Sequence, residues 1–156
     1  MKSGEERFLE YINEQIYIEL SKEENISKDE IIAWGLELGI SDINNSKSSL
    51  MIKDKLIQNG ITYLDIYNKF KHKAYGIHPS RFENKFKVNS YQRRKMIETG
   101  FIKIAYYKEE EIYPGRFEKV PFFNPKWYFN ITINDIENWR INNIKGYGKQ
   151  QLKLDI

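Results

Sequence analysis

The chain has 156 residues, of which 40% are hydrophobic and 15% aromatic, enough for one ordinary domain or two small ones. It holds no cysteine and two histidines, which excludes disulfides and cysteine catalysis, and we expect no metal or other cofactor. No apolar run approaches the ~20 residues that cross a bilayer, so we expect a cytoplasmic protein without a membrane segment.

The net charge of +3 hides an uneven distribution along the chain. Residues 1–61 hold 7 Lys and Arg against 12 Asp and Glu, whereas residues 62–103 hold 10 against 3. Phosphate contacts need Lys and Arg gathered on one surface, so the basic segment indicates a site for a polyanion. An ordinary face of solvated lysines is the alternative.

Three helices are predicted in the acidic first part of the chain. Residues 5–20 carry apolar side chains every four residues on one side and glutamates on the other. A second helix begins with Ser27 and Glu30 in the spacing of a capping box and ends at Gly39. A third helix runs over about 47–58.

A Gly-terminated helix, a polar loop and a second helix containing the run Ser46–Leu56 follow one another over residues 27–60. This arrangement resembles the SAP family and its helix–extended loop–helix relatives, which often bind DNA. The resemblance implies Lys47, Lys53 and Lys55 as candidate DNA contacts. Because the segment holds four lysines against five acids, a packing or protein-docking role is open beside DNA contact.

The basic middle segment predicts short helices. One begins at Thr62, and a second spans Pro79–Phe86, with proline in the first turn, where its missing N–H is not needed. A three-residue turn, 87–89, leads to Ser90 as the N-cap of a further helix that ends before Gly100.

A β-hairpin and a final helix are predicted in the rest of the chain. Residues 101–107 and 117–123 have high β propensity, and Tyr113–Arg116 holds Pro and then Gly as a turn signal. Thr132 is the expected N-cap of the last helix, and the tail over 145–150 is expected to be mobile.

The order of helix, tight turn, second helix and hairpin is carried by Phe82, Phe86, Val88, Tyr91, Ile97, Gly100, Phe101 and Ile102. In this order residues 62–123 resemble the winged helix-turn-helix family, although the second helix is about one turn shorter than that family leads us to expect. We therefore expect a mainly α fold with a small β-hairpin. Its parts are an acidic, helical, SAP-like portion (1–61), a basic winged-helix-like domain (62–125) and a C-terminal helix and tail (126–156).

The helix predicted to follow Ser90 sorts its side chains by direction. At about 100° per residue, Met96 and Ile97 define the side that faces the core. The opposite arc is shared by Tyr91, Arg94, Lys95 and Glu98. Arg93 falls between the two core-facing residues, so we expect it to pack its stem or to pair with an acid.

Nine residues around the turn and the helix start form the candidate nucleic-acid-binding set. Gln92 suits adenine and Arg94 suits guanine, while lysine and tyrosine suit phosphates. For Tyr91 the alternative is a buried position that caps the helix. The candidates are Arg81, Lys85, Lys87, Asn89, Ser90, Tyr91, Gln92, Arg94 and Lys95.

Two further features have competing interpretations. Lys108, Arg116 and Lys119 are candidate contacts from the wing, opposed by the acidic run Glu109–Glu111. The aromatic residues between 106 and 129 suit either a stacking platform for single-stranded nucleic acid or, as we favour, the core of the hairpin and an apolar plug. The acids lack the spacing of a nuclease centre, so no enzyme is expected.

These patterns predict a non-enzymatic double-stranded DNA-binding protein, a regulator or accessory factor. Ile, Lys and Asn make up 56 of the 156 residues, a bias toward AT-rich codons that indicates bacterial, phage or mobile-element origin. A homodimer is compatible with this prediction. The alternative is a protein-binding module, such as a phage-encoded inhibitor that docks on a host protein.

Overall fold

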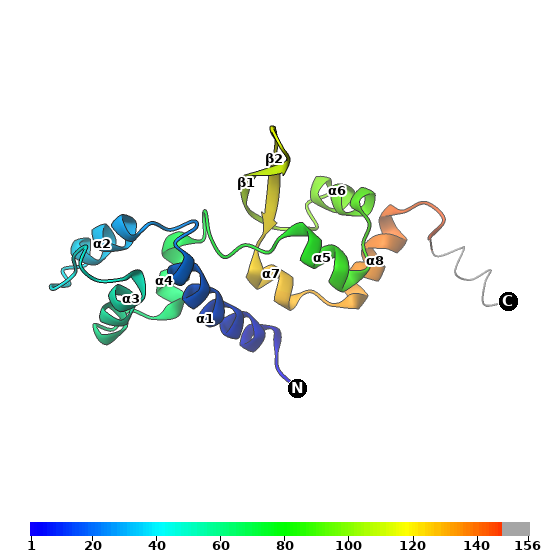
Figure 1. Ribbon diagram of the computed structural model, residues 1–156. Helices are drawn as coiled ribbons and strands as arrows, with labels where there is room; N and C mark the ends of the chain where they lie inside the picture. The colour runs from blue at the N-terminus through cyan, green and yellow to red at the C-terminus, as the bar shows by residue number, and fades with distance from the viewer. Residues whose placement is uncertain (148–156) are drawn as a thin grey trace.

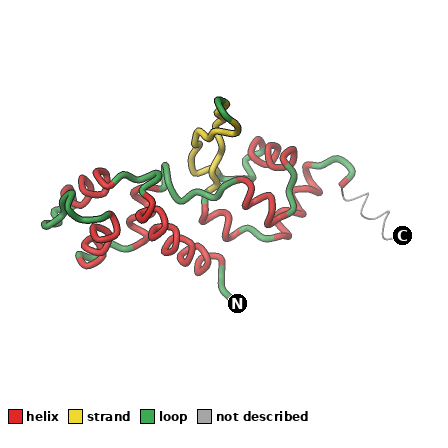
Figure 2. Tube along the Cα trace, in the orientation of Figure 1, coloured by secondary structure: helices red, strands yellow, loops and turns green. Residues whose placement is uncertain are grey.

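The computed structural model describes residues 1–147, and within them the chain forms eight helices and one two-stranded antiparallel sheet (Figure 1 and Figure 2). The fold is mainly α with a small β-hairpin, as the sequence predicts. The elements in chain order are α1 (Gly4–Lys22), α2 (Lys28–Glu37), α3 (Ser49–Gln58), α4 (Tyr63–Phe70), α5 (Pro79–Phe86), α6 (Ser90–Glu98), β1 (Ile104–Tyr113), β2 (Arg116–Phe123), α7 (Pro125–Asn130) and α8 (Ile133–Asn143).

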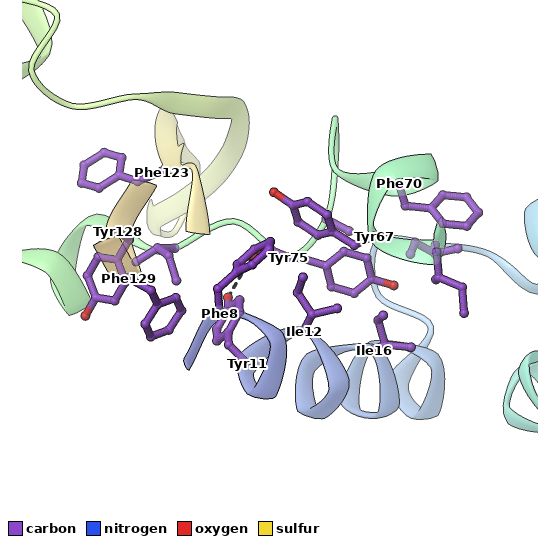
Figure 3. Close-up of a cluster of buried hydrophobic side chains, with 14 of the residues drawn as sticks. Phe8, Tyr11, Ile12, Ile16, Tyr67, Phe70, Tyr75, Phe123, Tyr128 and Phe129 are labelled. Atoms are coloured by element: carbon purple, nitrogen blue, oxygen red, sulfur yellow. Dashed lines mark hydrogen bonds between the residues drawn. The ribbon is translucent and has the colours of Figure 1, made fainter. Parts of the chain in front are cut away.

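Helix α1 joins the two ends of the elongated molecule. Figure 1 shows α2, α3 and α4 at one end, α5 to α8 at the other, and α1 between them. The Phe8 ring of α1 meets Tyr67 of α4 edge-on, with ring centroids 5.4 Å apart, and the Tyr11 ring lies 5.2 Å from Phe129 of α7 (Figure 3). Because one helix serves both ends, the buried side chains form a single hydrophobic cluster that runs from Phe8 to Trp139.

Most helix starts follow the predicted capping residues. Ser27 and Glu30 form the predicted capping box at the start of α2, and Thr132 caps α8 as predicted. Helix α5 has the predicted bounds. Helix α3 starts two residues later than predicted, because the Ser48 hydroxyl accepts the Met51 N–H (3.2 Å) and so caps the helix there.

The first strand of the hairpin lies further along the chain than predicted, whereas the second, Arg116–Phe123, lies within one residue of its predicted bounds. The first strand begins at Ile104 because the N–H groups of Phe101 and Ile102 donate to the Met96 carbonyl at the end of α6 (3.0 and 3.2 Å). These residues complete the helix terminus, so the prediction of a strand over 101–103 is wrong. The turn between the strands lies where the Pro-Gly signal predicts it.

Helix α7 is an element that the sequence prediction treats only as an apolar plug. Asn124 caps this six-residue helix by accepting the Trp127 N–H (3.1 Å), and Pro125 occupies its first turn. The helix buries Tyr128 and Phe129, which pack against α5 and α1. Helix α5, which carries the basic residues Arg81 and Lys85, therefore packs against α7.

No helix within residues 1–147 is both long enough and apolar enough to span a bilayer. Residues 148–150 of the tail predicted to be mobile lie outside the described residues. The order of helix, turn, helix and hairpin over 79–123 is observed. An element order alone does not identify a family, so the likeness to winged-helix and SAP domains and the three-part division of the chain stay predictions.

Candidate functional site

The N-cap of α6 is Asn89 and not Ser90, which corrects the sequence prediction by one position. The Asn89 backbone is extended (φ −86°, ψ 171°), and its Oδ1 accepts the Gln92 N–H at 2.8 Å. Asparagine at this position reaches the third helical N–H directly, so Ser90 becomes the first residue of the helix instead.

The outward face of α6 carries Tyr91, Arg94 and Lys95. Tyr91 is 57% exposed, so it is not the buried capping residue that was its alternative. Lys95 Nζ lies 3.4 Å from the Tyr91 hydroxyl oxygen, and among the described residues neither Arg94 nor Lys95 forms a salt bridge. Arg93 pairs with Glu83 of α5 (Nε to Oε1, 2.6 Å), as expected from its direction.

Gln92 is held by α8. Its Oε1 accepts from Arg140 Nε (3.2 Å), and the same guanidinium donates to the carbonyls of Phe86 (3.3 Å) and Lys87 (2.7 Å) and to Glu137 Oε1 (2.6 Å). Arg140 thus fastens α8 to the turn between α5 and α6, where the Lys87 side chain is exposed. Sequence reasoning missed this role, because its partners lie about fifty residues away; only the Glu137–Arg140 spacing hints at it.

The structure places Arg81 and Lys85 away from the outward face of α6. Position 83 lies about 200° around α5 from position 81 and about 200° from position 85. Because Glu83 meets Arg93 of α6, the two basic side chains point to the opposite side of α5. There the Arg81 guanidinium lies 5.6 Å from the Phe129 ring centroid, over α1 and α7. The predicted nucleic-acid-binding set is therefore two surfaces and not one.

The three lysines implied by the SAP resemblance are engaged within their own part of the chain. Lys47 and Lys55 both lie beside the Asp42 carboxylate, at 3.8 and 3.3 Å. Lys53 is buried, lies 3.2 Å from Asp54 and sits over tyrosine rings of α1 and α4. These contacts favour the packing role that the sequence left open for this segment.

The predicted cations of the wing face acidic neighbours. Arg116 lies 3.4 Å from Glu118, and Lys119 is directly opposite Glu109 in the register of the hairpin. Lys108 borders a polar cavity of about 320 Å³ between the hairpin and α1, which Glu110 also lines. Each predicted cation of the hairpin thus has a carboxylate nearby, although only Arg116 forms a salt bridge with one.

The aromatic residues of the hairpin and α7 divide into two groups. Phe123 and Tyr128 are buried, as the core interpretation predicts. Tyr107, Tyr113 and Phe117 are each more than half exposed, so the core interpretation does not extend to the end of the hairpin.

Within residues 1–147 no three His, Cys, Asp or Glu side chains gather closely enough to hold a metal ion. Comparison of the chain with protein-family models, with curated proteins and with solved structures finds no match. A function must therefore be inferred from the side chains of α6 and of the surfaces around it.

Proposed function

We propose that the protein binds double-stranded DNA through the outward face of α6, as a non-enzymatic regulator or accessory factor in the cytoplasm of a bacterial or phage-infected cell. The observation that carries this proposal is that exposed Tyr91 and Arg94 and half-buried Lys95 share one face of α6. Glu98 lies on the same face, but among the described residues neither cation forms a salt bridge. Such a face combines phosphate-neutralising charge with a side chain able to read guanine.

The dimensions of α6 are compatible with a duplex groove. An α-helix with its side chains is about 10–12 Å across, and the major groove of B-DNA is about 12 Å wide, so the groove admits it. The nine residues of α6, at about 1.5 Å each, make a helix about 14 Å long. Figure 1 shows the hairpin projecting from the side of the body where α6 lies. The hairpin therefore lies beside a duplex bound to α6, although its cations have acidic neighbours.

The start of α6 adds a second phosphate contact. The first N–H groups of a helix have no intrahelical partner, and Asn89 satisfies only that of Gln92. The N–H groups of Ser90 and Tyr91 remain for an anion, beside the exposed side chain of Lys87.

The test is fluorescence anisotropy of a labelled random duplex of about 25 base pairs, long enough for two helical turns. If α6 neutralises two phosphates, affinity falls about tenfold between about 50 and 200 mM salt. Replacing Arg94→Gln together with Lys95→Gln should weaken binding at low salt and reduce the salt slope by about 2.

The matched control is Lys69→Gln together with Lys71→Gln at the end of α4. Both lysines are exposed, and neither forms a salt bridge among the described residues, so the same two charges are removed elsewhere. The proposal requires that the α6 variant lose more affinity than the control. Equal losses, or no binding at low salt by the unaltered protein, would contradict it.

A second candidate function, docking on another protein, is supported by the end of the hairpin. Tyr107, Ile112, Tyr113 and Phe117 are each at least half exposed there, and aromatic side chains are enriched in protein interfaces. A chain that shows no DNA binding in the assay above, but crosslinks to a protein through a photoreactive group at Tyr113, would favour this candidate instead.

A further inference from the structure

Three cations gather on the side of α5 that faces away from α6. Arg81 and Lys85 are one turn apart on α5, and Arg7 comes from α1, with a guanidinium nitrogen that donates to the Phe129 carbonyl (3.4 Å). We call Arg7, Arg81 and Lys85 the α5 cation cluster. Among the described residues none of the three forms a salt bridge.

Aromatic rings hold the cluster in place. The Arg81 guanidinium carbon lies 5.2 to 5.6 Å from the ring centroids of Tyr11, Tyr128 and Phe129, and Lys85 Nζ lies 4.5 Å from that of Tyr128 (the rings are drawn in Figure 3). Rings that hold a guanidinium in place preorganise it for a bidentate oxyanion.

The three cations of the cluster repel one another, and among the described residues no carboxylate forms a salt bridge with them. Burial lowers the pKa of Lys85, and the positive charges of Arg7 and Arg81 lower it further. Like charges held together on apolar rings repel each other, and an anion bound between them relieves that repulsion.

A cavity of about 300 Å³ opens beside the cluster. Arg7 and Arg81 line it together with Glu10 and Glu14 of α1, and Lys85 lies outside this lining, one turn along α5 from Arg81. Glu10 is paired with Lys2 (2.6 Å), so positive charge exceeds negative charge around the cavity. The two acids would repel a duplex, which carries one charge per about 1.7 Å, whereas they accept hydrogen bonds from hydroxyl or amino groups.

We propose that the α5 cation cluster binds the phosphate group of a small phosphate monoester whose hydroxyl or amino groups reach Glu10 and Glu14. This site goes beyond DNA binding by α6, because the two surfaces lie on opposite sides of α5. The volume of the cavity is comparable to that of a sugar phosphate or a mononucleotide.

The test uses the full chain and isothermal titration calorimetry with ribose 5-phosphate, inorganic phosphate and ribose as probes. We expect ribose 5-phosphate to bind at least ten times more tightly than ribose or inorganic phosphate. Arg81→Gln with Lys85→Gln should weaken its binding at least tenfold. Glu14→Gln should weaken ribose 5-phosphate but not inorganic phosphate, because that acid accepts hydrogen bonds from the hydroxyl groups and repels the phosphate.

Two controls separate the source of the phosphate and the state of the fold. Arg94→Gln with Lys95→Gln should leave ribose 5-phosphate binding unchanged. Arg7→Gln, on an exposed residue of α1, should weaken that binding without altering α5. Thermal melts followed by circular dichroism verify that each variant is folded.

Three outcomes would overturn the proposal. They are absence of ribose 5-phosphate binding, equal losses in the α5 and α6 variants, and loss of duplex affinity in the α5 variant with no binding of the monoester. The last would assign the cluster to a DNA backbone, whereas failure of DNA binding alone would leave the monoester site intact.

Discussion

Replacing Arg140 with methionine tests how the proposed DNA-binding helix is held against the rest of the fold. The Arg140 side chain is 8% exposed and donates to the carbonyls of Phe86 and Lys87, to Gln92 and to Glu137. Methionine keeps most of the apolar stem but supplies no donor, so two backbone carbonyls at the end of α5 lose a partner.

The size of the effect follows from the number of bonds lost. A hydrogen bond from a charged donor contributes about 1.5–3 kcal/mol, and an acceptor left buried without a partner costs about as much as the bond. The Phe86 bond is buried and the Lys87 bond is partly buried, so they dominate. We expect Arg140→Met to lower the free energy of unfolding by about 3–5 kcal/mol, the range seen when one partner of a buried charged network is removed.

Urea denaturation followed by circular dichroism and tryptophan fluorescence measures this difference from the midpoint at unchanged m-value. Arg140→Lys should lose part of the stability, because an ammonium cannot fork between two carbonyls. Arg116→Met on the exposed hairpin is the matched control, and we expect less than about 0.5 kcal/mol there. A loss below about 1 kcal/mol for Arg140→Met would refute the role assigned to this side chain.

Three further outcomes are expected. Asn89→Ala should cost about 1 kcal/mol in urea denaturation, whereas Ser90→Ala should cost little; the reverse order would restore Ser90 as the cap. Gly76→Ala should lower the melting temperature strongly, because a Cβ atom at position 76 would lie 2.6 Å from a β2 side chain. Gly100→Ala should lower it less, because no atom lies within 4 Å of a Cβ there and only the positive φ of 78° opposes the alanine. Similar losses in the two variants would refute this reasoning. Lys85→Met should raise the denaturation midpoint at pH 7, because the folded protein holds the pKa of Lys85 below its usual 10.5. The folded state therefore releases this proton at a lower pH than the unfolded state does, so the stability of the unaltered protein rises with pH toward 10.5, and the variant should lose that rise. An unchanged midpoint would show that the charge costs nothing.

The helix starts are the part of the fold that the sequence predicts best. In the capping box of Ser27 and Glu30 both partners lie within one turn, so local spacing is enough to recognise it. Proline at the first turn likewise sets the start of α5 at Pro79. The same reasoning misplaces the cap of α6, because Asn89 and Ser90 are both good caps and the choice depends on which backbone is extended.

Elements that depend on distant partners are predicted less well. Helix α7 has only six residues and no helical period to reveal it; its burial against α1 stabilises it. The first strand begins late because the N–H groups at the end of α6 are taken by the Met96 carbonyl. Short elements of this kind gain their stability from tertiary packing, which no local pattern reports.

The sequence by itself determined a mainly helical fold, the capped helix starts, the hairpin turn and a basic middle segment, since each depends on residues a few positions apart. Only the tertiary structure decided which basic side chains share a surface. Arg93 forms a salt bridge with Glu83, and Gln92 accepts a hydrogen bond from Arg140. Arg81 lies over aromatic rings of α1 and α7. The direction of a side chain is set by contacts between residues far apart in the chain, and charge along a sequence does not encode them.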